Sequence, residues 1–455
     1  MKFFFEKIYS FLSTFWRNLK YQKIISKIFL IVKTFFEIFL KSFFAAKFKR
    51  SNYYIKKFFH CQIFFRLFLK MIFFDSQKSG KSFIFRDPQK IIFTKNFSEI
   101  KKKILEIENE IARGNWAAGF FSYEAGFFFE KYFREKILKN EKIAEKNFKN
   151  ATEKFLKNSN FPFLKFGIFA PPQVFRGPIP KKILQKNGEN FAIKNFSTAE
   201  NFEKYEKKFR KIREKILAGD FFQINLATKI FFDFFGSVEN FFLFLRQQQK
   251  VDFAAFLDFG DQKICSQSPE LFLKIRDQKI FFAPMKGTAK IDKIKNLLSE
   301  KNRAENEMIV DLLRNDAGKI AEKISVDQLF AIEKFDTLAQ MSSKISGKLK
   351  KNISIFEILA AIFPCGSVTG APKIRAMREI AALENFPRQI FCGAIGFFSK
   401  NFSEFSVPIR TILIENCRAE MGVGSGIVAD SRAKSEWDEI FLKTKFLEKI
   451  FKIKK

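Results

Sequence analysis

Short apolar segments of strand length follow one another through the middle of the chain, and they constrain its fold more than any other feature. The segments are rich in Phe, Ile and Leu, and they lie at residues 221–229, 253–258, 263–266, 271–275 and 279–282. Strands that come in adjacent runs favour antiparallel pairing, with helices packed outside. The sequence therefore predicts an α+β fold in which antiparallel sheets pack in layers with outer helices.

Helices are expected where apolar residues recur at helical spacing between charged ones, namely near residues 97–113, 199–218, 295–315, 353–363, 371–384 and 432–450. The Lys-, Glu- and Asn-rich segment 127–160 is predicted to be helical and exposed. Proline and glycine at 171–172 and 177–180 indicate a linker region. The sequence contains no internal repeat.

The composition excludes some classes of protein. The chain has 455 residues, of which 47% are apolar, so it can bury a large core. Its 68 Phe accompany abundant Lys, Ile and Asn, all encoded by A/T-rich codons, which indicates a bias of the genome. The formal net charge of +34 is spread over amphipathic segments, and the sequence shows no nucleic-acid-binding module. We therefore interpret the charge as solvated surface and expect no specific nucleic acid partner.

Cysteine usage favours a reducing compartment. The five cysteines, at positions 61, 265, 365, 392 and 417, form no Cys-x-x-Cys pair, and their odd number argues against a disulfide framework. The single histidine, His60, cannot complete a zinc site with them. A cytoplasmic location is predicted.

Residues 1–70 differ from the rest of the chain, with 15 Lys or Arg and only 2 acidic residues. Charges interrupt every apolar stretch, so neither a transmembrane helix nor a secretory signal is predicted. Two interpretations remain: basic amphipathic helices on a membrane surface, or an extension outside a functional protein that begins at Met71. We favour the second. The predicted domains are this extension (1–70), an N-terminal subdomain (71–190) and a catalytic domain (191–450).

Several motifs carry chemical groups. Lys286 lies between Pro284 and Gly287, and Glu270 precedes an apolar strand. Further motifs occur at 119–126, 303–306, 311–316, 367–373, 409–411 and 424–431. Together they resemble the chorismate-utilising enzymes over residues 71–450, most strongly over 199–446. Lys286 narrows the resemblance to the aminodeoxychorismate synthase component I group, and the resemblance implies that group's fold.

The acidic residues indicate a metal site. Glu436 and Glu439 are three residues apart and share a helical face, a pattern that alone is typical of exposed helices. The resemblance implies that Glu305 and Glu439 bind Mg²⁺ and that Glu436 supports them. Asn302 stands where relatives often have an acid.

Chorismate carries two carboxylates, and the sequence offers several groups that suit them. Arg410 can grip a carboxylate with two hydrogen bonds, and Gly424, Ser425 and Gly426 expose adjacent backbone N–H groups. Thr369 precedes a predicted helix start, where anions bind. The resemblance implies that these positions bind the substrate.

The resemblance also implies the catalytic roles. Glu270 would protonate the departing hydroxyl, and Lys286 would attack ring carbon C2 as a neutral amine. Gln223 stands near the position where isochorismate and salicylate synthases carry a water-activating Lys, which points to ammonia as the nucleophile. In two further departures, Gln340 replaces a common His and Phe391 a frequent Tyr.

These features predict an enzyme that aminates chorismate with ammonia to 4-amino-4-deoxychorismate, for 4-aminobenzoate and folate biosynthesis. No cysteine lies in a Gly-x-Cys-x-Gly motif, so the ammonia is expected from a separate glutamine amidotransferase subunit or from solution. Two alternatives stay open: anthranilate synthase component I, which aminates C2, and a basic membrane- or nucleic-acid-binding protein with a relic site.

A fragment of residues 71–455 should fold and keep full ammonia-dependent turnover, because every chemical group named above follows Met71. Turnover and thermal melting of this fragment, measured beside the full chain, test the predicted start. An inactive or unfolded fragment would show that residues 1–70 belong to the fold.

Overall fold

The computed structural model describes residues 71–76, 80–138, 160–185, 190–289, 291–334 and 339–447. These residues belong to one compact unit. The predicted extension, residues 1–70, lies outside the described part of the chain, as do most of the segment 127–160 after Leu138 and the residues after Leu447.

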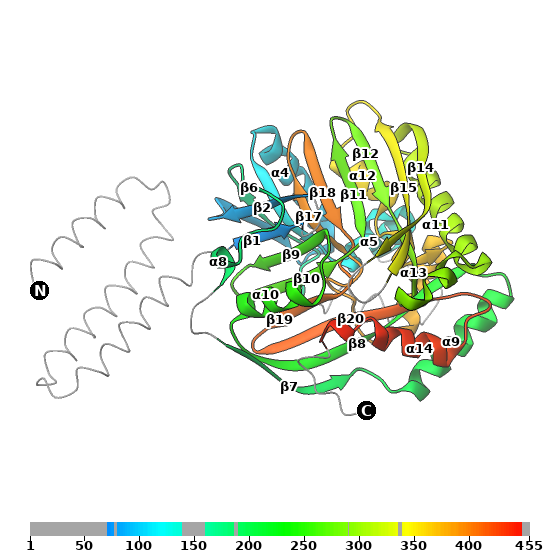
Figure 1. Ribbon diagram of the computed structural model, residues 1–455. Helices are drawn as coiled ribbons and strands as arrows, with labels where there is room; N and C mark the ends of the chain where they lie inside the picture. The colour runs from blue at the N-terminus through cyan, green and yellow to red at the C-terminus, as the bar shows by residue number, and fades with distance from the viewer. Residues whose placement is uncertain are drawn as a thin grey trace, which may run out of the picture. The chain divides into compact units, whose positions relative to one another are not determined.

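Two ten-stranded antiparallel sheets dominate the described residues, and the α+β prediction is confirmed (Figure 1). The first sheet has the order β16-β8-β20-β19-β10-β9-β1-β2-β6, with β7 also paired to β8. Its strands are β1 (Met71–Asp75), β2 (Lys81–Arg86), β6 (Gln173–Arg176), β7 (Phe191–Thr198), β8 (Gln223–Gly236), β9 (Phe253–Asp258), β10 (Gln262–Ser268), β16 (Gly370–Ala371), β19 (Thr411–Glu415) and β20 (Arg418–Ile427).

The second sheet has the order β13-β15-β12-β11-β18-β17-β4-β5-β3, with β14 also paired to β15. Its strands are β3 (Lys90–Thr94), β4 (Trp116–Phe121), β5 (Leu164–Phe169), β11 (Leu271–Arg276), β12 (Lys279–Ala283), β13 (Met285–Ala289), β14 (Ala321–Lys334), β15 (Ala339–Leu349), β17 (Ala394–Phe398) and β18 (Phe402–Ser406). Both sheets contain strands from either side of residue 190, where the sequence predicts a boundary between two domains. The division into an N-terminal subdomain and a catalytic domain stays a prediction.

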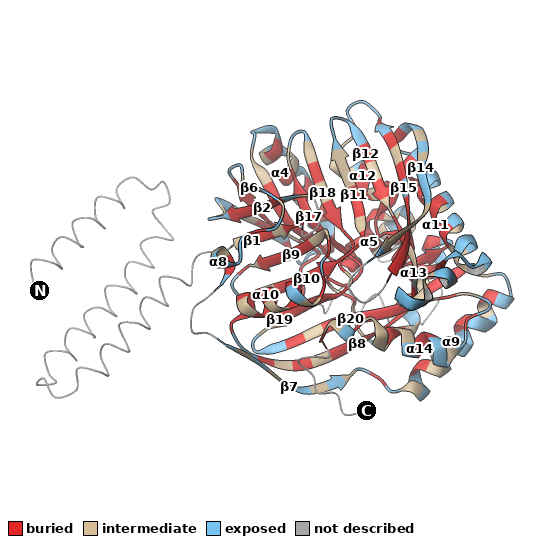
Figure 2. Ribbon diagram, viewed as in Figure 1, coloured by how far each residue is buried: buried red, intermediate tan, exposed pale blue. Residues whose placement is uncertain are grey.

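The longer helices lie outside the sheets, and their outer faces are exposed while most of the strands beneath them are buried (Figure 2). The α-helices are α4 (Ile100–Ala112), α5 (Gly126–Phe129), α6 (Lys131–Leu138), α8 (Lys181–Leu184), α9 (Phe202–Leu217), α10 (Val238–Gln248), α11 (Glu300–Gly318), α12 (Ile355–Ile362), α13 (Lys373–Leu383) and α14 (Ala433–Leu442). The 3₁₀ turns are η1 (Phe97–Glu99), η2 (Tyr123–Ala125), η4 (Ile291–Leu298), η5 (Gly366–Val368) and η6 (Lys445–Leu447).

Local sequence explains where the long helices begin and what they bury. In α9 the side chain of Asn201 caps the first turn by accepting a hydrogen bond from the Lys204 N–H. One apolar stripe of this helix is buried, and Gly219, with φ of 84°, ends the helical segment. Trp437 of α14 packs on this stripe, with its ring centroid 5.0 Å from that of Tyr205.

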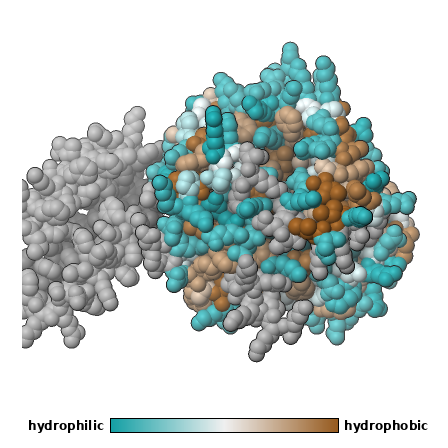
Figure 3. Space-filling view, in the orientation of Figure 1, coloured by the Kyte–Doolittle hydropathy of each residue, from teal (hydrophilic) through white to brown (hydrophobic). Residues whose placement is uncertain are grey.

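The two sheets pack on each other through aromatic side chains. Because neighbouring strand residues point to opposite faces, Phe83 and Phe85 lie in the core between the sheets while Ile84 lies in the core under the helices. Phe397 of β17 lies at the centre of the inner core and contacts the rings of Phe74, Phe83, Phe85, Trp116 and Phe402. Most of the Phe in the described residues therefore fills the interior, and the visible outer face shows hydrophilic side chains with apolar patches between them (Figure 3).

Three predictions from the sequence need correction. The described start of the segment 127–160 is helical, as predicted, but it is not exposed, because Phe127, Phe128, Phe129 and Phe133 are buried. The Pro- and Gly-rich region at 171–180 is not a linker: its residues 173–176 form β6, and Ile179 beyond them is 1% exposed. The helix predicted over 295–315 is two elements, because the Ser299 side chain accepts from the Asn302 N–H and starts α11 afresh. Within the described residues, no helix is both long and apolar enough to cross a bilayer.

A buried ion pair anchors the segment that follows β6. Arg246 of α10 lies 2.7 Å from Asp75 of β1, and its guanidinium also donates to the Ile179 carbonyl at 3.1 Å. Asp75 in turn accepts the Ile179 N–H at 2.7 Å. The two charges therefore join a strand, a helix and a connecting segment in the interior.

Arg246→Met should lower the free energy of unfolding by about 3–5 kcal/mol, because it leaves the Asp75 carboxylate buried without its cation. The matched control is Lys434→Met, which breaks the exposed Lys434–Asp438 pair of α14 and should cost less than about 1 kcal/mol. Urea unfolding of both variants measures the difference. Equal shifts would refute the structural role of the buried pair.

Candidate active site

Glu270 is a buried carboxyl at the start of β11. Its side chain is 2% exposed, and the Ser367 hydroxyl donates a hydrogen bond of 2.6 Å to Glu270 Oε1. Burial raises the pKa of Glu270, against the lowering effects of the Ser367 hydrogen bond and the Lys286 charge. A carboxyl with a raised pKa retains its proton closer to neutral pH, as a general acid requires.

Lys286 lies on β13, at a break in the pairing of this strand with β15. The register shifts between Lys286 and Thr288, and Gly287 has φ of 72°, which only glycine adopts without strain. The Lys286 ammonium donates to the Ser367 carbonyl at 2.8 Å. Burial lowers the pKa of Lys286, while the charges of Glu305 and Glu270 act to raise it. A lowered pKa increases the share of neutral, nucleophilic amine.

Arg410 is a buried cation that carries an unused donor. It is 5% exposed, and burial lowers its pKa to about 10. Its Nη2 donates weakly to Gln340 Oε1 at 3.4 Å, and its Nη1 has no hydrogen-bond partner. A desolvated guanidinium in this state favours an incoming carboxylate. The backbone of Arg410 has φ of 53°, an uncommon conformation that often marks functional positions.

Gln223 and Asn225, from the start of β8, face small residues of β20. A Cβ added to Gly426 would lie 2.3 Å from Gln223 Nε2, and one added to Gly424 would lie 2.7 Å from Asn225 Oδ1. The side-chain oxygens of Gln223 and Asn225 are buried without a hydrogen-bond partner. The glycines therefore make room for two polar side chains that still have acceptors to offer.

The other predicted substrate groups are built into the fold. Gly424, Ser425 and Gly426 lie in extended strand β20, paired with β8, and the Ser425 hydroxyl is 3.2 Å from that of Tyr205. Thr369 is fully buried, and its hydroxyl donates to the Cys365 carbonyl at 2.8 Å. Their predicted contact with substrate stays a prediction.

The predicted metal ligands come from two helices. Glu305 lies on α11 and acts electrostatically on Lys286. Glu436 and Glu439 lie on α14, where burial and the neighbouring Glu439 charge raise the pKa of Glu436. The Ser431 hydroxyl donates to Glu436 at 2.7 Å. In the part of the chain that the structure describes, no three His, Cys, Asp or Glu side chains are grouped closely enough to share one metal ion.

Lys443 and Ser367 are site residues that the sequence reasoning missed. Lys443 forms an ion pair of 2.8 Å with Glu439 and donates to the Gly424 carbonyl at 2.8 Å. Its spacing of four residues from Glu439 was the available signal. Ser367 lies in the motif at residues 367–373, yet nothing in the sequence shows that it contacts both Glu270 and Lys286.

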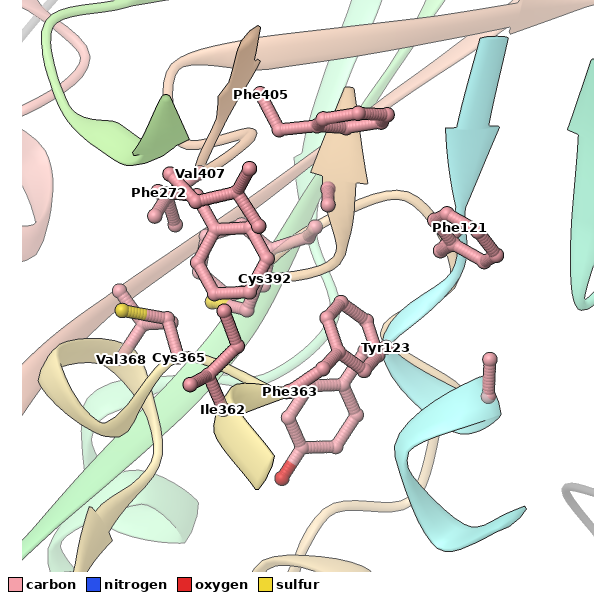
Figure 4. Close-up of a cluster of buried hydrophobic side chains, with 14 of the residues drawn as sticks. Phe121, Tyr123, Phe272, Ile362, Phe363, Cys365, Val368, Cys392, Phe405 and Val407 are labelled. Carbon is pink, nitrogen blue, oxygen red and sulfur yellow. The ribbon is translucent and has the colours of Figure 1, made fainter. Parts of the chain in front are cut away.

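The two departures from the usual family residues are accommodated differently. Gln340 retains a polar contact with Arg410, whereas Phe391 is 3% exposed and fills the space over Gly422, where an added Cβ would lie 2.3 Å from its ring. Phe391 belongs to the large apolar core, part of which, including Phe272, Cys365, Val368, Cys392 and Val407, is drawn in Figure 4.

Residues 69–449 match the model of the chorismate binding enzyme family, and because this span covers most of the sequence, the chain belongs to that family. It is 38% identical over 251 residues to aminodeoxychorismate synthase component 1 of Escherichia coli (strain K12), covering 52% of this chain and 55% of the relative. It is 41% identical over 219 residues to the chloroplastic aminodeoxychorismate synthase of Arabidopsis thaliana, covering 45% and 24%. Anthranilate synthase component 1 of Aquifex aeolicus is 34% identical over 273 residues, covering 57% and 55%.

The matched segments thus span about half the length of these curated relatives, or less. Among solved structures, anthranilate synthase component I of Streptococcus pneumoniae TIGR4 superposes with a TM-score of 0.68 at 25% identity, covering 82% of this chain and 92% of that one. The isochorismate synthase MenF of Escherichia coli, at 15% identity and a TM-score of 0.62, covers 84% and 88% and shares the fold. The resemblance predicted from the motifs is confirmed.

Proposed function

We propose that this chain aminates chorismate with ammonia to give 4-amino-4-deoxychorismate, on the route to 4-aminobenzoate and folate. The observation that carries the proposal is the pairing of Lys286, whose pKa is lowered, with Glu270, whose pKa is raised, through one serine. The similarity to the two aminodeoxychorismate synthases named above, at 38% and 41% identity, supports the same reaction.

In the proposed mechanism, neutral Lys286 attacks ring carbon C2 of chorismate. The ring double bonds shift, and the C4 hydroxyl leaves as water after it receives the Glu270 proton. Ammonia then bonds to C4, the double bonds shift back, and Lys286 is expelled from C2. The proton that ammonia loses restores the one that Glu270 gave, so both side chains return to their starting states.

Substrate binding rests on the cations and small residues around this pair. Arg410, with its unused Nη1, is proposed to bind a chorismate carboxylate. Gly424, Ser425, Gly426 and Thr369 are proposed to contribute further polar contacts. Gln223, whose amide cannot serve as a base for water, would leave ammonia as the nucleophile.

Chorismate-utilising enzymes are generally Mg²⁺-dependent, and the acidic residues fit that ion. Mg²⁺ needs only one or two carboxylates, because water and substrate complete its shell. Glu436 and Glu439 supply two carboxylates close enough that one raises the pKa of the other. We propose Glu305 and Glu439 as ligands, with Glu436 in support. When bound, the ion would neutralise a substrate carboxylate.

The source of ammonia is proposed to be a second subunit. Several of the relatives carry the name component 1, which implies a further component. We propose a glutamine amidotransferase in this role, and a cytoplasmic location for the pair remains our inference from the cysteine pattern.

Anthranilate synthesis is the second candidate, because anthranilate synthase component 1 proteins are 34% and 32% identical to this chain. That reaction would place nitrogen on C2 and would not require Lys286. The decisive measurement is the product formed from chorismate, Mg²⁺ and ammonium: 4-amino-4-deoxychorismate supports the proposal, and anthranilate refutes it.

Lys286→Ala should abolish 4-amino product while leaving chorismate binding within a few-fold, since Lys286 acts in the chemical step and the carboxylates are bound by other residues. Chromatography of the product and fluorescence titration with chorismate measure the two quantities. The control is Lys344→Ala, which removes an exposed lysine from β15 of the same sheet. Full activity of Lys286→Ala would eliminate the covalent mechanism.

Glu439→Gln and Glu305→Gln should each raise the Mg²⁺ concentration for half-maximal rate by at least about 10-fold, the size expected even for loss of an outer partner. Asp438→Asn, on the exposed face of α14, is the matched control and should leave that concentration unchanged. If both Glu variants show the parental Mg²⁺ dependence, the ligand assignment is wrong.

A further inference from the structure

Glu270 and Lys286, the proposed acid and nucleophile, both contact one residue to which no role has yet been assigned. Glu270 comes from the start of β11 and Lys286 from β13, two strands that are separated in the sheet by β15 and β12. Ser367, in the η5 turn, contacts both of them: its hydroxyl donates to Glu270, and its carbonyl accepts from Lys286. We propose that Ser367 is a positioning residue that fixes the acid and the nucleophile relative to each other, and that the Cys365 thiol fixes the direction of its hydroxyl. The proposal rests on the catalytic roles of Glu270 and Lys286 given above.

The hydroxyl can donate only one hydrogen bond. At 2.6 Å, the bond to Glu270 Oε1 has the short length typical of hydrogen bonds to carboxylates. Cys365 Sγ lies 3.1 Å from the same hydroxyl oxygen, so the thiol must be the donor in that contact. Burial raises the pKa of Cys365 to about 12, which keeps the thiol protonated and able to donate. The chain of donors therefore runs from Cys365 through Ser367 to Glu270.

The direction of this chain determines which oxygen of Glu270 carries the acidic proton. Because Oε1 accepts the hydrogen bond from Ser367, the proposal places the proton of the neutral acid on Oε2. After the proton is given up, the Ser367 hydroxyl still donates to the carboxylate and stabilises its charge. The hydroxyl therefore orients the acid before the proton transfer and supports it afterwards.

The η5 turn is held rigidly enough to serve as this bridge. The Thr369 hydroxyl and the Val368 N–H both bond to the Cys365 carbonyl, at 2.8 and 3.3 Å. Arg388, which is 2% exposed, donates to the Val368 carbonyl at 3.1 Å. The Ser367 carbonyl that accepts from Lys286 is thus part of a fixed backbone. Its neighbours secure the turn independently of the Ser367 side chain, so a change of that side chain tests the hydroxyl alone.

Ser367→Ala should lower kcat by about 10- to 100-fold, the effect expected when a hydrogen bond to a charged group is lost. KM for chorismate should stay within about threefold, because the carboxylate-binding groups are untouched. Ser367→Thr, which keeps a hydroxyl, should recover most of the rate. The matched control is Ser82→Ala: Ser82 is also buried, and its hydroxyl lies 2.6 Å from the Gly177 carbonyl and 3.2 Å from the Asp75 carboxylate, far from Glu270 in the sequence. The Ser82→Ala variant should lower the melting temperature as much as Ser367→Ala does, without loss of kcat.

The thiol is tested in the same way. Cys365→Ala removes the donor to Ser367 and should lower kcat by a few-fold, whereas Cys365→Ser keeps a donor and should stay close to the parent. All variants are assayed as the full chain with ammonium, and the rate is scored as chorismate consumption with the product identified separately. A parent enzyme that forms anthranilate would refute the 4-amination proposal while leaving the variant ratios readable. Ser367→Ala with a parental kcat, or equal losses of kcat in Ser367→Ala and Ser367→Thr, would overturn the positioning role.

Discussion

The arrangement of the site depends on one buried cation, Arg388. Its guanidinium pairs with Glu384 at 2.6 Å, lies 4.7 Å from the Tyr123 ring centroid, and donates to the carbonyls of Val368 and Asn225 at 3.1 and 2.7 Å. Val368 belongs to the η5 turn and Asn225 to β8, so one side chain holds both walls of the site. A guanidinium, planar and with five donors, is suited to join several fixed acceptors in this way. The Glu384 carboxylate extends the junction by accepting the Ala227 N–H at 3.0 Å.

The same junction reaches the second sheet through Glu124. This buried carboxyl follows β4 and accepts the backbone N–H groups of Arg388 and Gln389. Burial raises the pKa of Glu124 to about 7, even though these hydrogen bonds favour its charged form. The polar network thus runs continuously between the sheets at a place where aromatic packing alone would leave the backbone unsatisfied.

Much of the fold could be predicted from the sequence, because strand length and helical spacing are local properties. The strand at 253–258 is observed at those residues, and α9, α12 and α13 lie within the expected ranges. Local signals also misled: Gly and Pro at 171–180 indicated a linker, yet pairing with β2 makes residues 173–176 a strand. Pairing between distant segments cannot be read from one segment alone.

The site residues likewise divide into those that have a local sequence signal and those that depend on contacts between distant segments. Glu270, Lys286 and Arg410 are recognisable because rare motifs surround them, and the structure buries or half-buries each beside groups that shift its pKa. Ser367 acts through a contact with Glu270, 97 positions away, which no periodicity encodes, whereas Lys443 has a local signal only for its pairing with Glu439 and none for its contact with Gly424. Gly424–Gly426 suggested a nest of backbone N–H groups, but cross-strand pairing holds the segment extended, and the small residues instead make room for Gln223 and Asn225.

Trp437 gives the molecule a built-in optical reporter. It lies on α14 between Glu436 and Glu439, with its ring packed on Tyr205, and it is 9% exposed. The fluorescence of an indole ring responds to nearby charge. The binding of a cation or an anion at Glu436 and Glu439 should therefore change the fluorescence of Trp437. The other tryptophan within the described residues, Trp116, lies in the aromatic core between the sheets, where such a charge is remote. The fluorescence of Trp437 can therefore be followed against that of Trp116 as an internal reference.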